Sequence, residues 1–428
     1  MITRRSFLAT TTASLIAGRA PALAQPSQPR FKPARTDFLT FQPQHVSSFR
    51  SASPGLTFNS LYNLESPPAW VRLVYCNEAR DSETIDGAAI APTAIMGDGF
   101  TAFNAQGKPD ASLWKRVTFA SGGDDTRPHA IKASAAETIE IDGDVTFGRN
   151  PPPPTFSDWI PIEPLHRTDG GKGTLLLVRT FSRGQFRNQF ARYQKIGGDR
   201  VGRVHADFTS QGDATQSPWS FSGEASEIPA AWAIQYQSAV PGASVLFAGD
   251  SILAPPYEFS IGLRACALAS TPQLPVSFIN QAKLGAATSE YVPAARRELE
   301  WSRPQILVLQ PWSGNEPVIN EATGDAMVAL SMSLVSFALK NQCAPILVTT
   351  PPVPHFPAQE PYRQRSNAQI REAAENGLTL FDLDKLWADE AAPSTFRAGY
   401  TRDQIHGTDI ACNAAAEALS PIIRGLLT

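Results

Sequence analysis

The part of the chain from residue 242 to residue 428 alternates short apolar runs with helical patterns, and this alternation restricts the fold more than any other feature. Strands that are buried on both faces read as continuous apolar runs of this kind. The pattern predicts an α/β domain whose parallel sheet lies between two helical layers. In such sheets the active site lies beyond the carboxyl ends of the strands. The expected strands are 244–248, 275–279, 305–309, 345–349 and 378–382, and the expected helices are 321–340, 363–375 and 409–427.

Residues 65–241 have a different pattern, in which short β-type runs are separated by turn residues and no long helical period intervenes. Within this part, Asp142-Gly143 has the composition of a hairpin turn. Short strands of this kind predict a mainly-β accessory domain, either a sandwich or a jelly-roll-like fold. Residues 25–64 are expected to form an extended N-terminal segment. The expected strands of the accessory domain are 70–75, 115–119, 138–147, 173–181 and 231–236.

The first 24 residues have the features of a bacterial export signal. Arg4 and Arg5 precede an apolar stretch, and Ala22-Leu23-Ala24 supplies a small-x-small cleavage site. The paired arginines are typical of a twin-arginine signal peptide, so we expect a periplasmic or secreted protein. The alternative is that the apolar stretch remains uncleaved as an anchor, although it is short for a membrane span of about 20 residues. After cleavage we expect no stable association with a membrane.

Charge and cysteine usage exclude some classes of function. The formal net charge is −3, and the first 24 residues contribute three arginines and no acid. A chain this acidic has no evident electrostatic route to nucleic acid or to an anionic membrane surface. The four cysteines form no Cys-x-x-Cys pair, so no zinc or redox motif is supported. Disulfide bonds and four buried thiols are both compatible with their spacing.

Three short motifs in the C-terminal part carry the residue types of acyl-transfer chemistry. Gly249-Asp250-Ser251 follows the run 244–248, so we expect Ser251 at the carboxyl edge of the sheet and at the start of a helix, whose free N–H groups favour negative charge. The motif at residues 310–316, Gln-Pro-Trp-Ser-Gly-Asn-Glu, follows the expected strand 305–309. In Asp403-x-x-His406 the carboxylate can hold one imidazole nitrogen while the other takes a proton from a serine. Each motif alone has an ordinary interpretation, as a turn or as a helix cap, but their order is specific.

With these motifs in this order, residues 242–428 resemble the SGNH hydrolase superfamily, also called GDSL esterases and lipases. Gly249-Asp250-Ser251-Ile252 matches the first block of the family, and Asp403-x-x-His406 matches the last. The resemblance implies a flavodoxin-like three-layer α/β/α fold. It also implies that Ser251 is the nucleophile, that His406 is its base, and that Asp403 orients the imidazole.

The resemblance further implies an oxyanion hole formed by the N–H groups of Ser251 and Gly285 and by the side-chain amide of Asn315. Gly285 follows Asn280 in a segment that resembles the second block, with loose spacing. The third block departs from the family's Gly-x-Asn-Asp, because Ser313 stands at its first glycine and Glu316 at its last acid. No metal or cofactor is implied.

The expected function is a serine-dependent ester hydrolase that forms an acyl-enzyme and removes O-acetyl or similar short acyl groups from carbohydrate. The expected partner is therefore a small-molecule or polysaccharide ester, which the β domain would position. A lipase or thioesterase for longer acyl chains, a glycan-binding protein with an inactive hydrolase domain, and an O-acetyltransferase remain as alternatives.

Four further features have a structural and a functional interpretation. Trp312 can line the acyl pocket or pack in the core, and His355 can lie at the mouth of the site or on the surface. Asp124-Asp125 lacks partners at metal-ligand spacing and is interpreted as a solvated turn. The prolines 151–154 are interpreted as a stiff surface connection.

Overall fold

The computed structural model describes most of the chain, with the N-terminal 30 residues and several internal segments outside the description. The expected signal peptide, Asp124-Asp125, the Asp142-Gly143 turn and most of the proline stretch lie outside the described residues. The described ranges are 31–42, 55–76, 83–96, 101–119, 139–141, 154–183, 206–215, 224–225, 231–254 and 261–428.

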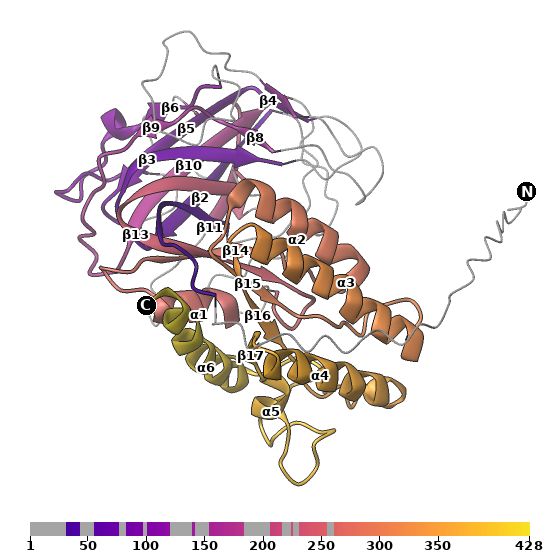
Figure 1. The fold of residues 1–428 in the computed structure, drawn as a ribbon. Coiled ribbons are helices and arrows are strands. Elements are labelled where there is room, and N and C mark those ends of the chain that lie inside the picture. The colour runs from indigo at the N-terminus through magenta and orange to yellow at the C-terminus, as the bar shows by residue number, and fades with distance from the viewer. Residues whose placement is uncertain are drawn as a thin grey trace, which may run out of the picture.

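The described part of the N-terminal half is built mainly on two β-sheets, which lie at the top of the molecule in Figure 1. The first sheet pairs β1 (Thr36–Phe41) and β3 (Pro68–Tyr75) antiparallel with the first part of β13 (Ala233–Ala248). The second sheet has the order β12-β11-β2-β10-β5-β6. Its strands are β2 (Leu56–Leu64), β5 (Gly87–Thr93), β6 (Lys115–Arg116), β10 (Thr174–Ser182), β11 (Ala206–Gln211) and β12 (Glu224–Ala225). Short elements complete this half: β4 (Glu83–Ile85), β7 (Ile139–Ile141), β8 (Thr155–Phe156), β9 (Ile160–Pro161) and η1 (Ala111–Leu113). Of these, β4 and β7 form a separate two-stranded sheet.

The two sheets pack face to face, as in a β-sandwich. Side chains of both sheets belong to one buried apolar cluster, and tyrosine hydroxyls connect the sheets across it. The hydroxyl of Tyr62 donates to the carbonyl of Ala231 at 2.8 Å, and that of Tyr75 lies 2.9 Å from the hydroxyl of Thr180. The buried tyrosines therefore satisfy their polar ends while their rings fill the core.

The C-terminal half contains a parallel sheet with the order β14-β13-β15-β16-β17. Numbered from β13 along the chain, this is the order 2-1-3-4-5 of a flavodoxin-like doubly wound sheet, as the sequence predicted. Four of the expected strands of this half lie within one residue or two of their predicted bounds, and the expected strand 244–248 is the end of the longer β13. The strands after β13 are β14 (Val276–Asn280), β15 (Ile306–Leu309), β16 (Ala344–Val348) and β17 (Thr379–Phe381).

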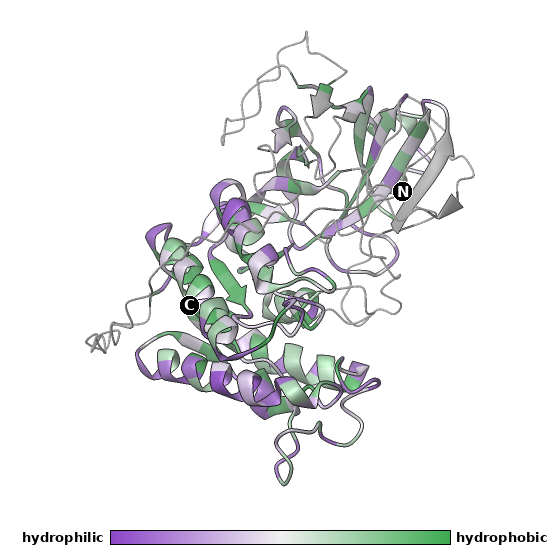
Figure 2. Cartoon of the chain, turned by 90° about the vertical axis from the view of Figure 1, so that its right-hand side faces the viewer, coloured by the Kyte–Doolittle hydropathy of each residue, from purple (hydrophilic) through white to green (hydrophobic). Residues whose placement is uncertain are grey.

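Helices cover both faces of this sheet, and alternate residues of the strands contact opposite layers. Val245 and Phe247 of β13 belong to the apolar cluster that contains the helices α1 and α6, whereas Leu246 belongs to the cluster that contains α2 and α3. In Figure 2 the helices carry both hydrophilic and hydrophobic residues, and the strand visible between them is hydrophobic. The helices are α1 (Ile261–Ala269), α2 (Thr288–Ser302), α3 (Glu321–Lys340), α4 (Glu360–Glu375), α5 (Leu383–Trp387) and α6 (Asp409–Leu427), with the short η2 (Pro357–Gln359) before α4.

Helices α3 and α6 are long and apolar enough to cross a membrane by composition alone. Each buries one stripe of side chains within the domain, for example Met327 and Leu334 of α3 and Leu419 and Ile423 of α6. Their apolar character is therefore explained by the layers that they form on the sheet.

The two halves share the strand β13, which the sequence did not predict as one element. Its residues up to Gly242 pair antiparallel in the upper sheet, and residues from Ala243 onward pair parallel in the lower one. The expected domain boundary at residues 241 and 242 therefore lies inside this strand. A side chain at Gly242 would place its Cβ 2.1 Å from the carbonyl oxygen of Pro275, so the close approach of the two backbones requires glycine there.

The segment expected to be an extended N-terminal lead-in also contributes to both sheets. β1 pairs with β13, and β2 pairs with β10 and β11 near the centre of the second sheet. Helix α2 was not predicted either, and the helix expected to begin at Ser251 corresponds to α1, whose described residues begin at Ile261. α2 contains Pro293 and has few apolar residues, so it lacks the long apolar pattern that marks α3 and α6.

Candidate active site

Ser251 lies on a tight turn at the carboxyl end of β13. The N–H groups of Leu253 and Ala254 both donate to the carbonyl of Asp250, at 3.1 and 3.0 Å. Gly249 packs closely here, since a Cβ at this position would lie 2.9 Å from the Oε1 atom of Gln310 and 3.1 Å from its Cβ, so a larger residue would displace the Gln310 side chain. The expected edge position of Ser251 is therefore present. The expectation that Ser251 begins a helix is wrong, because helix α1 begins at Ile261.

The structure brings the hydroxyl of Ser251, the imidazole of His406 and the carboxylate of Asp403 into one hydrogen-bonded chain. The Nε2 atom of His406 lies 2.9 Å from the Oγ atom of Ser251. The Nδ1 atom lies 2.7 Å from Oδ2 of Asp403. The imidazole is 17% exposed, so one edge is shielded while the site stays open to a ligand. With Nδ1–H donating to the carboxylate, Nε2 is the free base that faces the hydroxyl.

The loop that carries His406 is held by bonds within the loop itself. The Oδ1 atom of Asp403 accepts the N–H groups of Ile405 and His406, at 3.0 and 2.7 Å. Gln404, which lies between Asp403 and Ile405, has the left-handed φ of 67° that this turn requires. The alternative that Asp403 caps the last helix is wrong, because the side chain of Thr408 accepts the N–H of Ala411 and caps α6.

The carboxylate of Asp403 is stabilised in its ionised form. Partial burial opposes ionisation, but the N–H and the imidazole of His406 and the N–H of Ile405 donate to the carboxylate and outweigh it, so the pKa of Asp403 is lowered. Asp403 therefore remains an acceptor for the Nδ1–H group of His406 at neutral pH.

Two of the expected oxyanion donors are available. Among the residues that the structure describes, the backbone N–H groups of Ser251 and Gly285 have no hydrogen-bond acceptor. Gly285 has a left-handed φ of 66°. The N–H of Lys283 donates to the carbonyl of Gly249 at 3.0 Å, which holds the segment of Gly285 beside the turn of Ser251.

The third expected donor, Asn315, is engaged by its neighbours. Its side-chain Nδ2 donates to the carbonyl of Ala286 at 3.2 Å and to Oγ of Ser313 at 3.1 Å. These contacts place the amide next to Gly285, but both of its hydrogens have acceptors. Asn315 can therefore serve an oxyanion only after one of these bonds is released.

A buried network beneath the turn was missed by sequence reasoning. Oδ2 of Asp250 accepts the hydroxyl of Ser313 at 2.7 Å and the side-chain amide of Gln310 at 3.1 Å. Its Oδ1 accepts the N–H of Ile252 at 2.9 Å. Burial raises the pKa of Asp250 despite these bonds. No local signal predicts this network, because its members follow two different strands.

The two departures in the third block are explained by these contacts. Ser313 occupies the position of the first glycine in the Gly-x-Asn-Asp block of SGNH hydrolases. Its hydroxyl connects Asp250 to Asn315. Glu316 turns away from this network and accepts the N–H and the hydroxyl of Ser289, at 3.0 and 3.2 Å, in the first turn of α2. A carboxylate at a helix N-terminus is favourable.

The remaining candidate residues have structural positions. Trp312 is fully buried, which favours the core interpretation, and the exposed His355 packs edge-on against Phe356. The four cysteines, all within the described residues, form no disulfide bond; three are buried and Cys76 is half-buried. Among the described residues, no group of three or more His, Cys, Asp or Glu side chains is placed to hold a metal ion.

Comparison with known proteins gives matches among solved structures only. No family model and no curated protein matches the sequence. A putative acylhydrolase from Bacteroides fragilis is 17% identical, with a TM-score of 0.36 over 43% of this chain and 88% of that chain. An acetyl xylan esterase, AlAXEase, is 19% identical, with a TM-score of 0.36 over 42% of this chain and 99% of that one. A GDSL-like lipase from Bacteroides thetaiotaomicron is 17% identical, with a TM-score of 0.35 over 42% of this chain and 88% of that one.

These likenesses extend over less than half of the chain. By its own strand order and helical layers, the C-terminal half has the three-layer α/β/α fold that the resemblance to SGNH hydrolases predicted.

Proposed function

We propose that this chain is a serine ester hydrolase of the SGNH type, which removes O-acetyl or similar short acyl groups from carbohydrate. One observation carries the proposal: the hydroxyl of Ser251, the imidazole of His406 and the carboxylate of Asp403 form a continuous hydrogen-bonded chain at the carboxyl edge of a parallel sheet. This is the arrangement that activates a serine hydroxyl, which is a poor nucleophile without an adjacent base.

In the first half of the reaction, Nε2 of His406 takes the proton of Ser251 while Oγ attacks the ester carbonyl carbon. The resulting oxyanion accepts hydrogen bonds from the N–H groups of Ser251 and Gly285. The Asn315 amide joins them when it releases the carbonyl of Ala286. His406 then returns the proton to the departing alcohol, which leaves Ser251 acylated.

In the second half, His406 takes a proton from water, and the hydroxide attacks the acyl carbon. The tetrahedral intermediate collapses, the free acid leaves, and the proton returns to Oγ of Ser251. Asp403 holds the Nδ1–H tautomer throughout and stabilises the imidazolium that forms in each half. A sugar hydroxyl in place of water would give the acyltransferase alternative.

The carbohydrate part of the proposal rests on architecture. The β-sandwich is joined to the hydrolase fold through one strand, and an accessory β-module of this kind can position a glycan. This is an analogy at the level of the fold. A lipase or thioesterase would instead need an extended apolar groove for a long acyl chain.

The purified chain tests this proposal with p-nitrophenyl esters of increasing acyl length and with acetylated glycans. We expect hydrolysis of the acetyl ester, acetate release from at least one glycan, and loss of both activities in Ser251→Ala. A clear preference for long acyl chains would favour the lipase or thioesterase. Equal rates in the wild type and Ser251→Ala would favour the glycan-binding protein with an inactive hydrolase domain.

The proposal includes export through the twin-arginine route, which rests on Arg4 and Arg5 alone. Replacing both with lysine is expected to retain the protein in the cytoplasm of a bacterial host. Fractionation of cells that produce the full chain measures this, and unchanged export would contradict the twin-arginine assignment.

A further inference from the structure

A cavity of about 330 Å³ lies where the β-sandwich meets the α/β half, and we call it the junction cavity. Its volume is within the usual range for small-ligand sites, ~300–1,000 Å³. β1, β3, β13 and the end of helix α2 all contribute to it. The lining residues are Thr36, Phe38, Leu39, Thr40, Arg72, Trp159, Gln235, Trp301, Ser302, Arg303 and Gln305.

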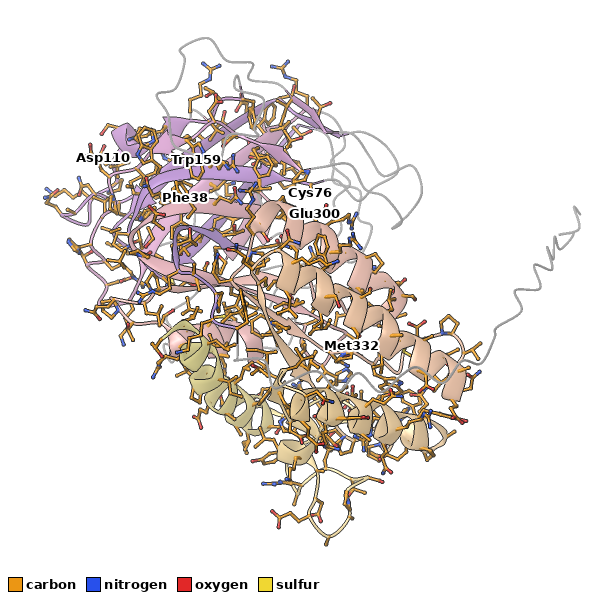
Figure 3. All side chains as sticks on the ribbon, in the orientation of Figure 1. Phe38, Cys76, Asp110, Trp159, Glu300 and Met332 are labelled. Carbon is orange, nitrogen blue, oxygen red and sulfur yellow. The ribbon has the colours of Figure 1, made fainter. Side chains whose placement is uncertain are left out.

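Aromatic rings form much of the wall. Phe38 and Trp159, both labelled on the β-sandwich in Figure 3, pack edge to face with ring centroids 5.7 Å apart. Trp301 enters from the end of α2, next to the labelled Glu300, and packs against Phe156 at 5.9 Å. Trp159 is buried and its ring lies under the guanidinium of Arg72, whereas Phe38 and Trp301 are half-buried. Phe38 and Trp301, one ring from each half of the molecule, can therefore contact the C–H groups of a ligand.

The polar side chains of the lining are neutral or positively charged. The guanidinium of Arg72 lies over the ring of Trp159 at 4.9 Å, and its Nε donates to Oε1 of Gln235 at 2.7 Å. Arg303 is exposed, and within the described part of the chain its guanidinium has no acidic partner. No Asp or Glu lines the cavity. A cation is therefore disfavoured, and a carboxylate is the group that guanidinium side chains bind best.

The cavity lies at the opposite edge of the parallel sheet from Ser251. Gln305 precedes β15, and its Oε1 accepts the N–H of Ser244, near the point where β13 enters the parallel sheet. Seven residues at about 3.3 Å each separate Ser244 from Ser251, or roughly 20 Å. A group bound in the junction cavity thus cannot present its own ester to Ser251.

We propose that the junction cavity is a second, non-catalytic carbohydrate site that takes a sugar residue bearing a carboxylate. It holds an acidic polysaccharide on the enzyme while Ser251 acts on an ester elsewhere along the polymer. The rings of Phe38 and Trp301 contact the sugar ring, and Arg303 binds the carboxylate. The inference rests on the proposed function for the class of substrate, because it names the polymer on which the esterase acts.

The test measures binding by calorimetry in the Ser251→Ala background, which separates binding from turnover. The probes are oligogalacturonate and a neutral xylooligosaccharide of equal length. We expect saturable binding of the acidic oligosaccharide and at least tenfold weaker binding of the neutral one. Binding of both with equal affinity, or of neither at millimolar concentration, would overturn the proposal.

Two variants of the lining locate the site. Arg303→Asn removes the guanidinium and suits the left-handed φ of 47° at this position, since asparagine tolerates that conformation. Trp301→Leu removes the aromatic face and keeps an apolar side chain. Each is expected to weaken binding of oligogalacturonate by about tenfold. Thermal unfolding checks that both variants are folded.

Arg296→Gln is the matched control, because it removes a positive charge from the same helix at a residue outside the cavity. It should leave binding unchanged. An equal loss of affinity in Arg296→Gln and Arg303→Asn would show that the effect comes from the net charge, and it would contradict the proposed site.

Kinetics with active Ser251 distinguish the two proposals. With acetylated pectin as substrate, Arg303→Asn should raise KM by about tenfold and leave kcat unchanged. Its rate with p-nitrophenyl acetate should equal that of the wild type. Esterase activity without oligogalacturonate binding would contradict only the junction site. Binding without esterase activity would contradict only the proposed function.

Discussion

The two loops that meet at the hydroxyl of Ser251 are held in different ways. The turn of Ser251 depends on a buried carboxylate, Asp250, whose partners Gln310 and Ser313 come from another strand end. The loop of His406 depends on a half-exposed carboxylate, Asp403, whose partners lie within three residues of it. Burial raises the pKa of Asp250, and local hydrogen bonds lower that of Asp403. The nucleophile is therefore positioned by tertiary structure, and the base by local sequence.

The largest expected effect is at the point where the two loops meet. Ser251→Ala removes the nucleophile and should lower kcat for p-nitrophenyl acetate by about 10⁶-fold. The free energy of unfolding should change little, because the side chain is half-buried and its hydroxyl contacts His406. Steady-state kinetic assays measure kcat, and chemical denaturation measures the free energy of unfolding. A loss smaller than 10²-fold would remove Ser251 from the mechanism.

Asp403→Asn separates the chemical role of the local loop from its folding. Oδ1 can still accept the N–H groups of Ile405 and His406, so the turn should remain. The Nδ1 atom of His406 loses its carboxylate partner, and kcat should fall by up to about 10⁴-fold. Asp403→Ala removes the turn as well, so it should show an equal loss of kcat and a larger loss of stability. Equal stability in both variants would contradict the structural role of Oδ1.

The same residue predicts a pH dependence of stability. The pKa of Asp403 is lowered from 3.8 in the folded state, so its ionised form stabilises the fold. This contribution is fully present above about pH 4 and is lost as the pH falls through the lower, folded pKa. Asp403→Asn should remove that dependence. Unfolding followed between pH 2 and pH 6 measures it, and parallel curves for the two proteins would exclude the coupling.

Asn315→Ala tests the region between the two loops. The Asn315 amide touches Ser313 on the network of the nucleophile and Ala286 next to Gly285. If it joins the oxyanion hole, its loss should lower kcat by about 10²–10³-fold with little change in KM. An unchanged kcat would assign Asn315 a structural role, with the backbone N–H groups as the only donors.

Asp250→Asn should mainly lower the stability of the protein, whereas Asp403→Asn should mainly lower kcat. In this variant an amide nitrogen takes the place of Oδ2 and faces the hydroxyl of Ser313 and the amide of Gln310. One of these two donors would then lose its acceptor. Because this site is buried, we expect a loss of about 2 kcal/mol in the free energy of unfolding. Denaturant unfolding at neutral pH measures it. A variant as stable as the wild type would show that the network is not a structural support.

The smallest expected effect is at the helix cap that follows the loop of His406. Thr408→Ala removes the side chain that accepts the N–H of Ala411 and should lower stability by about 1 kcal/mol. Activity should be retained, since Asp403 holds the turn independently. A large loss of kcat would show that the position of His406 depends on α6 and not on its own loop.

The sequence predictions were accurate for features that depend on local sequence and failed for features that depend on tertiary contacts. Helices α3 and α6 are long and rich in apolar residues, the strands of the parallel sheet are continuous apolar runs, and both lie where expected. Helix α2 was missed because it has few apolar residues and contains Pro293, and the continuity of β13 was missed because Pro241 and Gly242 look like a break. Gly242 is in fact a point of close backbone approach.

The sequence by itself determined the alternation of strands and helices in the C-terminal half, the parallel character of its sheet, and the short motifs that hold Ser251 and the Asp403–His406 turn. These are local properties, since they depend on hydrophobic period and on hydrogen bonds between residues close in the chain. Only the tertiary structure decided that residues 155 positions apart share a hydrogen bond, that Asp250 is buried against Ser313, and that rings from both halves enclose the junction cavity. Such contacts arise when separate elements pack together, and no segment of the sequence contains them.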